Sequence, residues 1–200
     1  MKKVLLFFSL FLFLSCNKSS VPVENLSECC CPHATIYLQP YEDFSRREAE
    51  KLIPILEEHF CDLLYGHWEF KVLNPISLPD NSKVQEKSKY KAITILHSEE
   101  KLVKEGVMIG LTHKDICADA HNVKDYGIVG MSFSPGNVCI VSDKRLSNKS
   151  DYWKPIIHEF IHAFYGAKHC PNDDPRCLMK DAKGKGTFRI QNYLCDSCKQ

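Results

Sequence analysis

Three residue types near position 160 have the spacing of a hydrolytic metal site. His158 and His162 are four positions apart, so on an α-helix both imidazoles project from one face and can bind a single ion. Glu159 stands beside the first of them, where it can take a proton from a metal-bound water. Gly166 suits the left-handed conformation that ends a helix, after which the chain can turn back and bring His169 to the same ion. Three neutral imidazoles and a water describe a catalytic zinc site that is open at its fourth position.

An apolar helix is expected to carry these ligands. Residues that recur at helical spacing make one broad buried face: Tyr152, Trp153, Ile156, Ile157, Phe160, Ile161 and Phe164. Ser150 or Asp151 is the expected N-cap, and Pro155 is tolerated near the first turn. The alternative is a chance match in a helix that merely needs polar residues, but such a helix requires neither the glycine nor the third histidine.

Four cysteines follow at spacings typical of a structural zinc site: Cys170, Cys177, Cys195 and Cys198. The Cys-x-x-Cys pair at the end, with another pair upstream, is similar to a zinc ribbon, and four thiolates satisfy a closed tetrahedral site. Two disulfides are the alternative, because the compartments that receive exported proteins are oxidising.

These motifs together resemble the signature of the archaemetzincins, a small branch of the metzincin zinc peptidases: His158-Glu159-x-x-His162, Gly166-x-x-His169-Cys170, Cys177-x-Met179 and Cys195-x-x-Cys198. The resemblance is specific in the C-terminal third, extends more weakly back to about Thr35, and does not cover the N-terminus. It implies an α+β, metzincin-like (zincin) single domain, with a mixed twisted sheet backed by helices. The active-site helix would be followed by a short Cys-rich C-terminal subdomain.

The resemblance also implies two zinc ions. The catalytic ion would be held by His158, His162 and His169, and the structural ion by the four cysteines of 170–198. Met179 would pack beneath the catalytic zinc as a support for the histidines, without ligating the ion; a simple core residue is the alternative.

Three spacings depart from the family pattern, and the mildest is a slightly short gap between Met179 and Cys195. Gly166 follows His162 by four positions where the family usually has three, and a widened last helical turn would absorb the extra residue. Six residues separate Cys170 from Cys177 where the family usually has four. Insertions of this size in loops cost little, so the same ligands are expected.

The N-terminus has the pattern of a bacterial export signal. Lys2 and Lys3 precede the apolar run 4–14, which is too short to span a bilayer stably. Ser15-Cys16 resembles a lipoprotein cleavage site, so residues 1–15 would be removed and Cys16 lipidated. The protein is then expected to be exported and anchored by acyl chains to a membrane of a bacterial envelope. Ordinary signal cleavage and an uncleaved anchor are the alternatives.

The rest of the chain is expected to consist of a tether, 16–33, and one metallopeptidase domain, 34–200, because its length suits a single core. Lysine and arginine number 26 against 25 aspartates and glutamates. This balance gives no reason to expect nucleic acid or an anionic surface as a partner.

The expected sheet contains five apolar segments: 35–39, 68–72, 107–111, 128–133 and 138–142. Ser45 and Glu48 form a capping-box pair that opens a helix, which Pro54 should bend or interrupt. The polar segment 74–89 is expected to be a surface loop. The segment 89–103 fits both strand and helix, and the family resemblance favours helix. In metzincin-like folds a strand at the cleft binds extended peptide, and Gly127–Phe133 is the candidate; an ordinary hairpin is the alternative.

Six further cysteines suggest disulfides that pin the tether to the domain: Cys29, Cys30, Cys31, Cys61, Cys117 and Cys139. A metal-binding tract of the first three with His33 is the alternative. A second ligand cluster is conceivable at 113–121, where His113, Cys117, Asp119 and His121 lie close in sequence, but a solvated loop is the preferred interpretation. His59, His67 and His97 stand alone, and no function is expected of them.

The chemistry expected from this pattern is hydrolysis of a peptide bond in a peptide or protein substrate, with Glu159 as the general base. A non-catalytic exported lipoprotein that binds zinc or a partner is the second hypothesis, and hydrolysis of a non-protein amide is the third.

Overall fold

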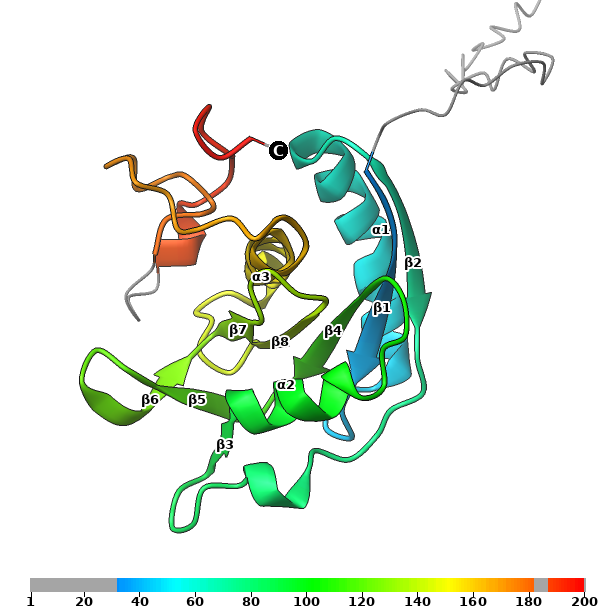
Figure 1. The fold of residues 1–200 in the computed structure, drawn as a ribbon, viewed down its shortest axis with the longest axis vertical. Helices are drawn as coiled ribbons and strands as arrows, with labels where there is room; N and C mark the ends of the chain where they lie inside the picture. Colours follow the sequence, from blue (N-terminus) through cyan, green and yellow to red (C-terminus); the bar gives the residue numbers. More distant parts are fainter. Residues whose placement is uncertain (1–31, 182–186, 200) are drawn as a thin grey trace, which may run out of the picture. The chain divides into compact units, whose positions relative to one another are not determined.

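Five strands form the central sheet of the computed structural model, which describes residues 32–181 and 187–199 (Figure 1). Their order across the sheet is β2-β1-β4-β8-β7. Their bounds are His67–Val72 for β2, His33–Pro40 for β1, Val107–Thr112 for β4, Val138–Ser142 for β8 and Gly130–Ser132 for β7. The first four are parallel to one another, and β7 is antiparallel to β8. Because β7 is last in the order, it is an edge strand. All five lie in one compact unit, Cys31–Gln200.

The two central strands are buried along their whole length. Every residue of β4 and β8 is inaccessible to solvent, as expected for parallel strands covered on both faces. Alternate side chains enter two separate cores: Ile109 and Leu111 point to one face of the sheet, and Met108 points to the other.

Helices cover both faces. α1 (Arg46–Leu63) and α3 (Trp153–Tyr165) pack on the face that receives Ile109, and α2 (Ala92–Glu100) packs on the opposite face. The expected mixed sheet backed by helices is therefore confirmed. The α2 helix agrees with the expectation for 89–103, except that the first three residues of this segment form the short strand β3 (Lys89–Lys91).

The start of α1 follows from its sequence. The side chain of Ser45 accepts a hydrogen bond from the Glu48 amide while the Glu48 carboxylate accepts one from the Ser45 amide, which is the predicted capping box. Pro54 does not end the helix, contrary to one form of the prediction. Proline has no amide hydrogen, so the Glu50 carbonyl four residues earlier lacks its helical hydrogen bond. Both residues lie on the exposed face of the helix, where water can take the place of the missing donor.

A second, three-stranded sheet includes strand β5 (Asp115–Ala120), in the segment 113–121 where a solvated loop was predicted. Its order is β3-β5-β6, with β5 and β6 (Val123–Ile128) paired antiparallel. His121 and Asn122 connect the two strands and both have positive φ, which is the backbone of a tight hairpin turn. The loop interpretation is wrong, because Cys117 and Ile116 of β5 are buried.

Short 3-10 helices complete the secondary structure: η1 (Asp80–Ser82), η2 (Lys149–Asp151) and η3 (Thr187–Arg189). The polar segment 74–89 is otherwise a loop, as expected. Among the described residues, no helix is both long and apolar enough to cross a bilayer.

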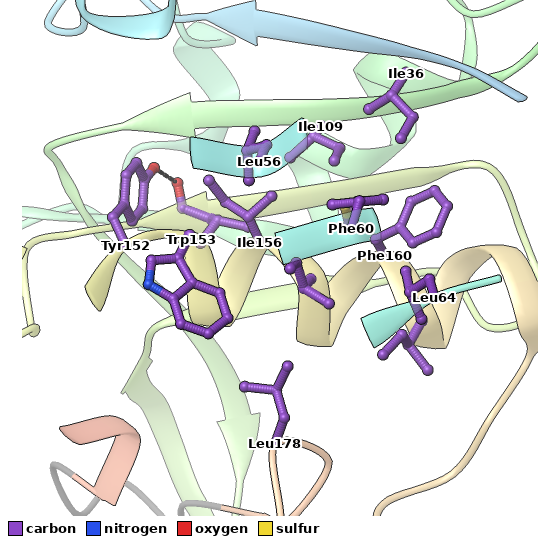
Figure 2. Packing of buried hydrophobic residues seen from close by; sticks show 14 of the residues in the cluster. Ile36, Leu56, Phe60, Leu64, Ile109, Tyr152, Trp153, Ile156, Phe160 and Leu178 are labelled. Carbon is purple, nitrogen blue, oxygen red and sulfur yellow. Dashed lines mark hydrogen bonds between the residues drawn. The ribbon is translucent and has the colours of Figure 1, made fainter. Parts of the chain in front are cut away.

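Aromatic rings hold α3 against the sheet and α1 (Figure 2). The ring centroid of Phe160 lies 4.8 Å from that of Phe60 and 5.3 Å from that of Trp68. At the start of the helix, the Tyr152 hydroxyl donates a 2.8 Å hydrogen bond to the Val141 carbonyl of β8. Helix α3 is thus fixed to the sheet by packing and by a buried hydrogen bond.

Candidate functional site

Helix α3 begins at Trp153, one or two residues later than the predicted N-caps suggested. Ser150 and Asp151 belong to η2, which runs directly into the helix, and neither is its N-cap. Asn148 caps this combined segment instead, because its side chain accepts a 3.1 Å hydrogen bond from the Ser150 amide. The ligand-bearing part of the helix is unaffected, and His158, Glu159 and His162 are all buried.

Gly166 ends α3 as predicted. Its φ is 65° and its ψ is 18°, the left-handed conformation that glycine adopts without strain. Its amide donates a 3.1 Å hydrogen bond to the His162 carbonyl four residues earlier. The last turn is therefore regular, and the extra residue before the glycine does not widen it.

The turn at Gly166 brings the third histidine to the other two. The Nε2 atom of His158 lies 3.0 Å from that of His162 and 3.3 Å from that of His169. Zinc binds imidazole nitrogen at about 2.0–2.1 Å, so a tetrahedral site has nitrogens ~3.3 Å apart. The three rings thus present their nitrogens at the separations that one ion requires.

Two backbone carbonyls orient the buried rings. The Nδ1 atom of His158 lies 2.8 Å from the Leu178 carbonyl oxygen, and the Nδ1 atom of His162 lies 2.5 Å from that of Ala167. A carbonyl oxygen can only accept, so each Nδ1 carries the proton and each Nε2 presents its lone pair toward the common point. Neither carbonyl was predicted from the sequence, because a residue of any type can supply one.

The environment keeps these imidazoles neutral. Burial lowers the pKa of His158 to about 3, helped by the neighbouring charge of His162. Burial also lowers the pKa of His162. Neutral imidazole is the form that ligates metal, so both rings are ready to bind at physiological pH.

Glu159 lies next to this metal-binding group, with 8% of its surface exposed. Burial raises the pKa of its carboxyl to about 7, and a hydrogen bond from Ser132 of β7 acts in the opposite direction. Gly130 of the same strand lies so close that an added Cβ would be 2.6 Å from Cγ of Glu159. The edge strand and the carboxyl are therefore in direct contact.

A cleft of about 560 Å³ opens onto this group. Glu159 and the three histidines line it on one side, and the continuous segment Tyr126–Ser132 of β6 and β7 lines it on another. Of the predicted peptide-binding segment Gly127–Phe133, residues 127–132 line the cleft and Phe133 packs against the second core; the first two residues belong to β6.

The four C-terminal cysteines also come together. Their Sγ atoms lie within 4.8 Å of one another, and those of Cys170 and Cys195 are 3.5 Å apart. A disulfide would need about 2.05 Å, whereas a tetrahedral zinc with bonds of about 2.3 Å places sulfurs ~3.8 Å apart. All four are free thiols in the structure, and their arrangement fits an ion.

One of these thiols is predisposed to ionise. Burial by itself raises the pKa of Cys195, but hydrogen bonds from Cys170, Cys177 and Cys198 outweigh it and lower that pKa to about 7. Donors converging on one sulfur stabilise its thiolate, the form that binds metal.

A short segment joins the two groups. The Leu178 amide donates a 2.7 Å hydrogen bond to the Tyr193 carbonyl, and the Met179 carbonyl accepts a 2.8 Å bond from the Cys170 amide. Leu178 and Met179 are fully buried. These two backbone hydrogen bonds therefore position both the Leu178 carbonyl, which orients His158, and the cysteines on either side of it.

The remaining predicted residues do not join either group. Cys61, Cys117 and Cys139 are free thiols, the last two buried, so the structure gives no support for their pairing with the tether; Cys16 and Cys29–Cys31 lie outside the described residues. His113 is 2.9 Å from Asp143, and among the described residues it forms no ligand cluster with its sequence neighbours. His121 lines the cleft, a position that the hairpin creates.

Comparison with known proteins shows the fold. No family model matches the chain, and no curated protein matches it in sequence. The solved structure of an archaemetzincin from Archaeoglobus fulgidus, complexed with malonate, is similar with a TM-score of 0.65 and 24% identity, over 82% of this chain and 97% of that one. An archaemetzincin from Methanopyrus kandleri gives a TM-score of 0.68 and 24% identity, over 83% and 91%. This chain has the archaemetzincin fold, as the sequence motifs suggested.

Replacing Gly166 should show how much the left-handed turn contributes. We expect Gly166→Ala to lower the free energy of unfolding by about 1–2 kcal/mol, because alanine is strained at a φ of 65°. Gly166→Asn is the matched control, since it adds the same Cβ near Pro135 but tolerates the left-handed region better. Urea unfolding of the three chains measures the difference, and equal losses for Ala and Asn would contradict the explanation.

Proposed function

We propose that this chain is a zinc-dependent peptidase in which Glu159 is the general base. The observation that carries the proposal is the convergence of three imidazole nitrogens beside a buried carboxyl, in a cleft bordered by a strand edge. Zinc bound there would lower the pKa of a coordinated water and polarise the scissile carbonyl. The similar folds of two archaemetzincins support the same class of activity.

The histidines would hold the ion with little rearrangement. Their nitrogens already have the separations of a tetrahedral site, and backbone carbonyls set the tautomers of His158 and His162. Since His169 is the exposed member of the three, the open position of the site would face the cleft.

Glu159 is suited to move a proton. Burial raises the pKa of its carboxyl, which favours accepting a proton, and the charge of a bound zinc ion would lower the same pKa, which favours releasing it. The hydrogen bond from Ser132 fixes the carboxylate against β7, where it would take a proton from the attacking water and give it to the leaving amine.

Strand β7 would align the substrate. One side of Gly130–Ser132 pairs with β8, and its other side is the edge of the sheet. An extended peptide that adds to this edge would place its backbone beside Glu159, which touches Gly130.

The four cysteines would hold a second, structural zinc. Four thiols leave no position for a water or a substrate, so this ion would support the fold without taking part in the chemistry. Because the segment 177–179 also carries the carbonyl that orients His158, this ion would support the catalytic group indirectly.

A non-catalytic zinc-binding lipoprotein is less well supported. Pure metal storage requires no carboxyl beside the ligands, yet Glu159 is buried there and held by a hydrogen bond from the substrate-binding edge. The export signal and the lipid on Cys16 remain part of our proposal; they lie outside the described residues.

Replacing Glu159 by glutamine tests the assigned base. Glu159→Gln keeps the shape of the side chain but cannot accept the proton, so we expect hydrolysis of a peptide library to fall by at least about 100-fold. Zinc content, measured by elemental analysis, should not change. Hydrolysis at the wild-type rate would refute the role of Glu159, whereas no hydrolysis of any peptide by the wild-type chain would favour the binding alternative.

Two variants test the number of ions. We expect two zinc ions per wild-type chain and one each in His162→Ala and Cys177→Ser, because each change removes a ligand of only one group. Elemental analysis of the dialysed chains gives the stoichiometry. One ion in the wild-type chain, together with oxidised Cys170, Cys177, Cys195 and Cys198 in a thiol titration of the denatured, unreduced chain, would instead support two disulfides.

The lipid anchor is tested on intact protein from a bacterial host. We expect the measured mass to correspond to a mature chain that begins at Cys16 and carries covalently bound acyl chains. Cys16→Ser should abolish both the acylation and the membrane association. Mass spectrometry of the membrane fraction measures both. A mature wild-type chain without added lipid would contradict this part of the proposal.

A further inference from the structure

The cleft extends beyond Glu159 along β6 to an arginine that the proposed mechanism does not use. Arg145 lies in the loop between β8 and η2 and lines the same cleft as Glu159 and the three histidines. Its chemistry suits recognition of an anion, because guanidinium groups bind carboxylates through two parallel hydrogen bonds.

Arg145 is held in a fixed orientation. Its Nε atom donates a 2.7 Å hydrogen bond to Oδ1 of Asp115, and its Nη2 donates a 2.8 Å bond to Oδ2. The guanidinium also lies flat against Gly127 of β6, where an added Cβ would be only 1.9 Å from Cζ of the arginine. Both contacts remove conformational freedom that a ligand would otherwise have to restrict.

One edge of the guanidinium remains available. Asp115 occupies the edge formed by Nε and Nη2, so a ligand in the cleft would approach the opposite edge, at Nη1. The side chain of Arg145 is 39% exposed while that of Asp115 is 17% exposed. Arg145 lines the cleft, and Asp115 is not among the lining residues.

The acidic groups of the cleft do not compete strongly for this edge. Asp151 is 2.8 Å from the buried ammonium of Lys154. Asp181 acts on His158 and His162, which places it at the histidine end. Arg189 adds a second positive charge to the lining of the cleft.

Distance along the strands relates Arg145 to the reacting bond. Arg145 contacts Gly127 and Glu159 contacts Gly130, three residues further along the chain. A fully extended chain covers at most ~3.6 Å per residue, so the two contact points are within about 11 Å. A peptide paired antiparallel to this edge would run from β7 toward β6, and its residues after the scissile bond would approach Arg145.

We propose that Arg145 is a specificity-determining residue that binds a substrate carboxylate two or three residues to the C-terminal side of the cleaved bond. The group would be an acidic side chain of the peptide. This inference rests on the proposed peptidase function, and it adds a preferred substrate class: peptides with an anion at this position.

The test uses the full zinc-loaded chain and pools of fluorogenic decapeptides that carry Glu, Gln or Lys at one position at a time. We expect Glu at the second or third position after the cleaved bond to raise kcat/KM about tenfold over Gln, because a charge-assisted pair replaces a neutral contact. Arg145→Gln should reduce this ratio to about one. Gly127→Ala should lower the ratio as well, since its Cβ displaces the guanidinium but keeps the charge.

Arg46→Gln is the matched control. Arg46 is an exposed arginine on α1 paired with Glu50, and it does not line the cleft, so the tenfold ratio should persist. Equal rates for Glu and Gln in the wild-type chain, or an unchanged ratio in Arg145→Gln, would overturn the inference while leaving the peptidase function intact.

Binding gives a readout that does not need turnover. In the Glu159→Gln background, fluorescence anisotropy should show the Glu decapeptides binding about tenfold more tightly than their Gln counterparts, and adding Arg145→Gln should remove the difference. If the wild-type chain cleaves no peptide, the proposed function fails, and this measurement alone decides whether Arg145 recognises an anion. Equal affinities would then reject it.

Discussion

The structure of the site depends on two hydrogen bonds from histidine rings to backbone carbonyls. Leu178 and Ala167 supply the carbonyl oxygens, and each fixes the proton of one buried ring on Nδ1. Without them the rings of His158 and His162 could rotate or change tautomer, and their Nε2 atoms would not point to one place. Helix α3 thereby presents two ring nitrogens, 3.0 Å apart, toward one point.

The two carbonyls lie at different distances in sequence from the histidines that they orient: Ala167 is 5 residues after His162, and Leu178 is 20 residues after His158. Ala167 follows the left-handed turn at Gly166, so its position depends on one backbone angle near the helix end. Leu178 comes from the Cys-rich segment, whose position depends on contacts with residues near 193. Helix α3 provides the stationary partner for both, because its aromatic rings pack against α1 and the sheet on the side away from the cleft.

Local patterns in the sequence predicted much of this arrangement. The four-residue spacing of His158 and His162 determines their common face, and Ser45 with Glu48 specified the start of α1, because both relations are set within one or two helical turns. The glycine at position 166 was predicted for the same reason. The convergence of the three histidines follows once the helix and the turn are known.

Features that depend on distant residues were not predictable in this way. The pair of Arg145 and Asp115 joins residues 30 positions apart, and nothing in either local sequence indicates the partner. The β5–β6 hairpin was missed because Asp115–Ala120 is short and only partly apolar, and its burial comes from packing against other elements. Asn148 replaced the predicted N-caps since a 3-10 turn precedes the helix.

The shared segment 177–179 has a consequence for how the chain length can vary. Cys177 contributes a thiol to the cysteine group, the Leu178 carbonyl orients the His158 ring, and the Met179 carbonyl accepts a hydrogen bond from the Cys170 amide. Because the three residues are consecutive, the direction in which each of these groups points depends on the other two residues. Residues added between Cys170 and Cys177 only enlarge a surface loop, whereas one residue added within 177–179 would turn the Leu178 carbonyl away from His158. Insertions and deletions should therefore accumulate before this tripeptide and be excluded from it.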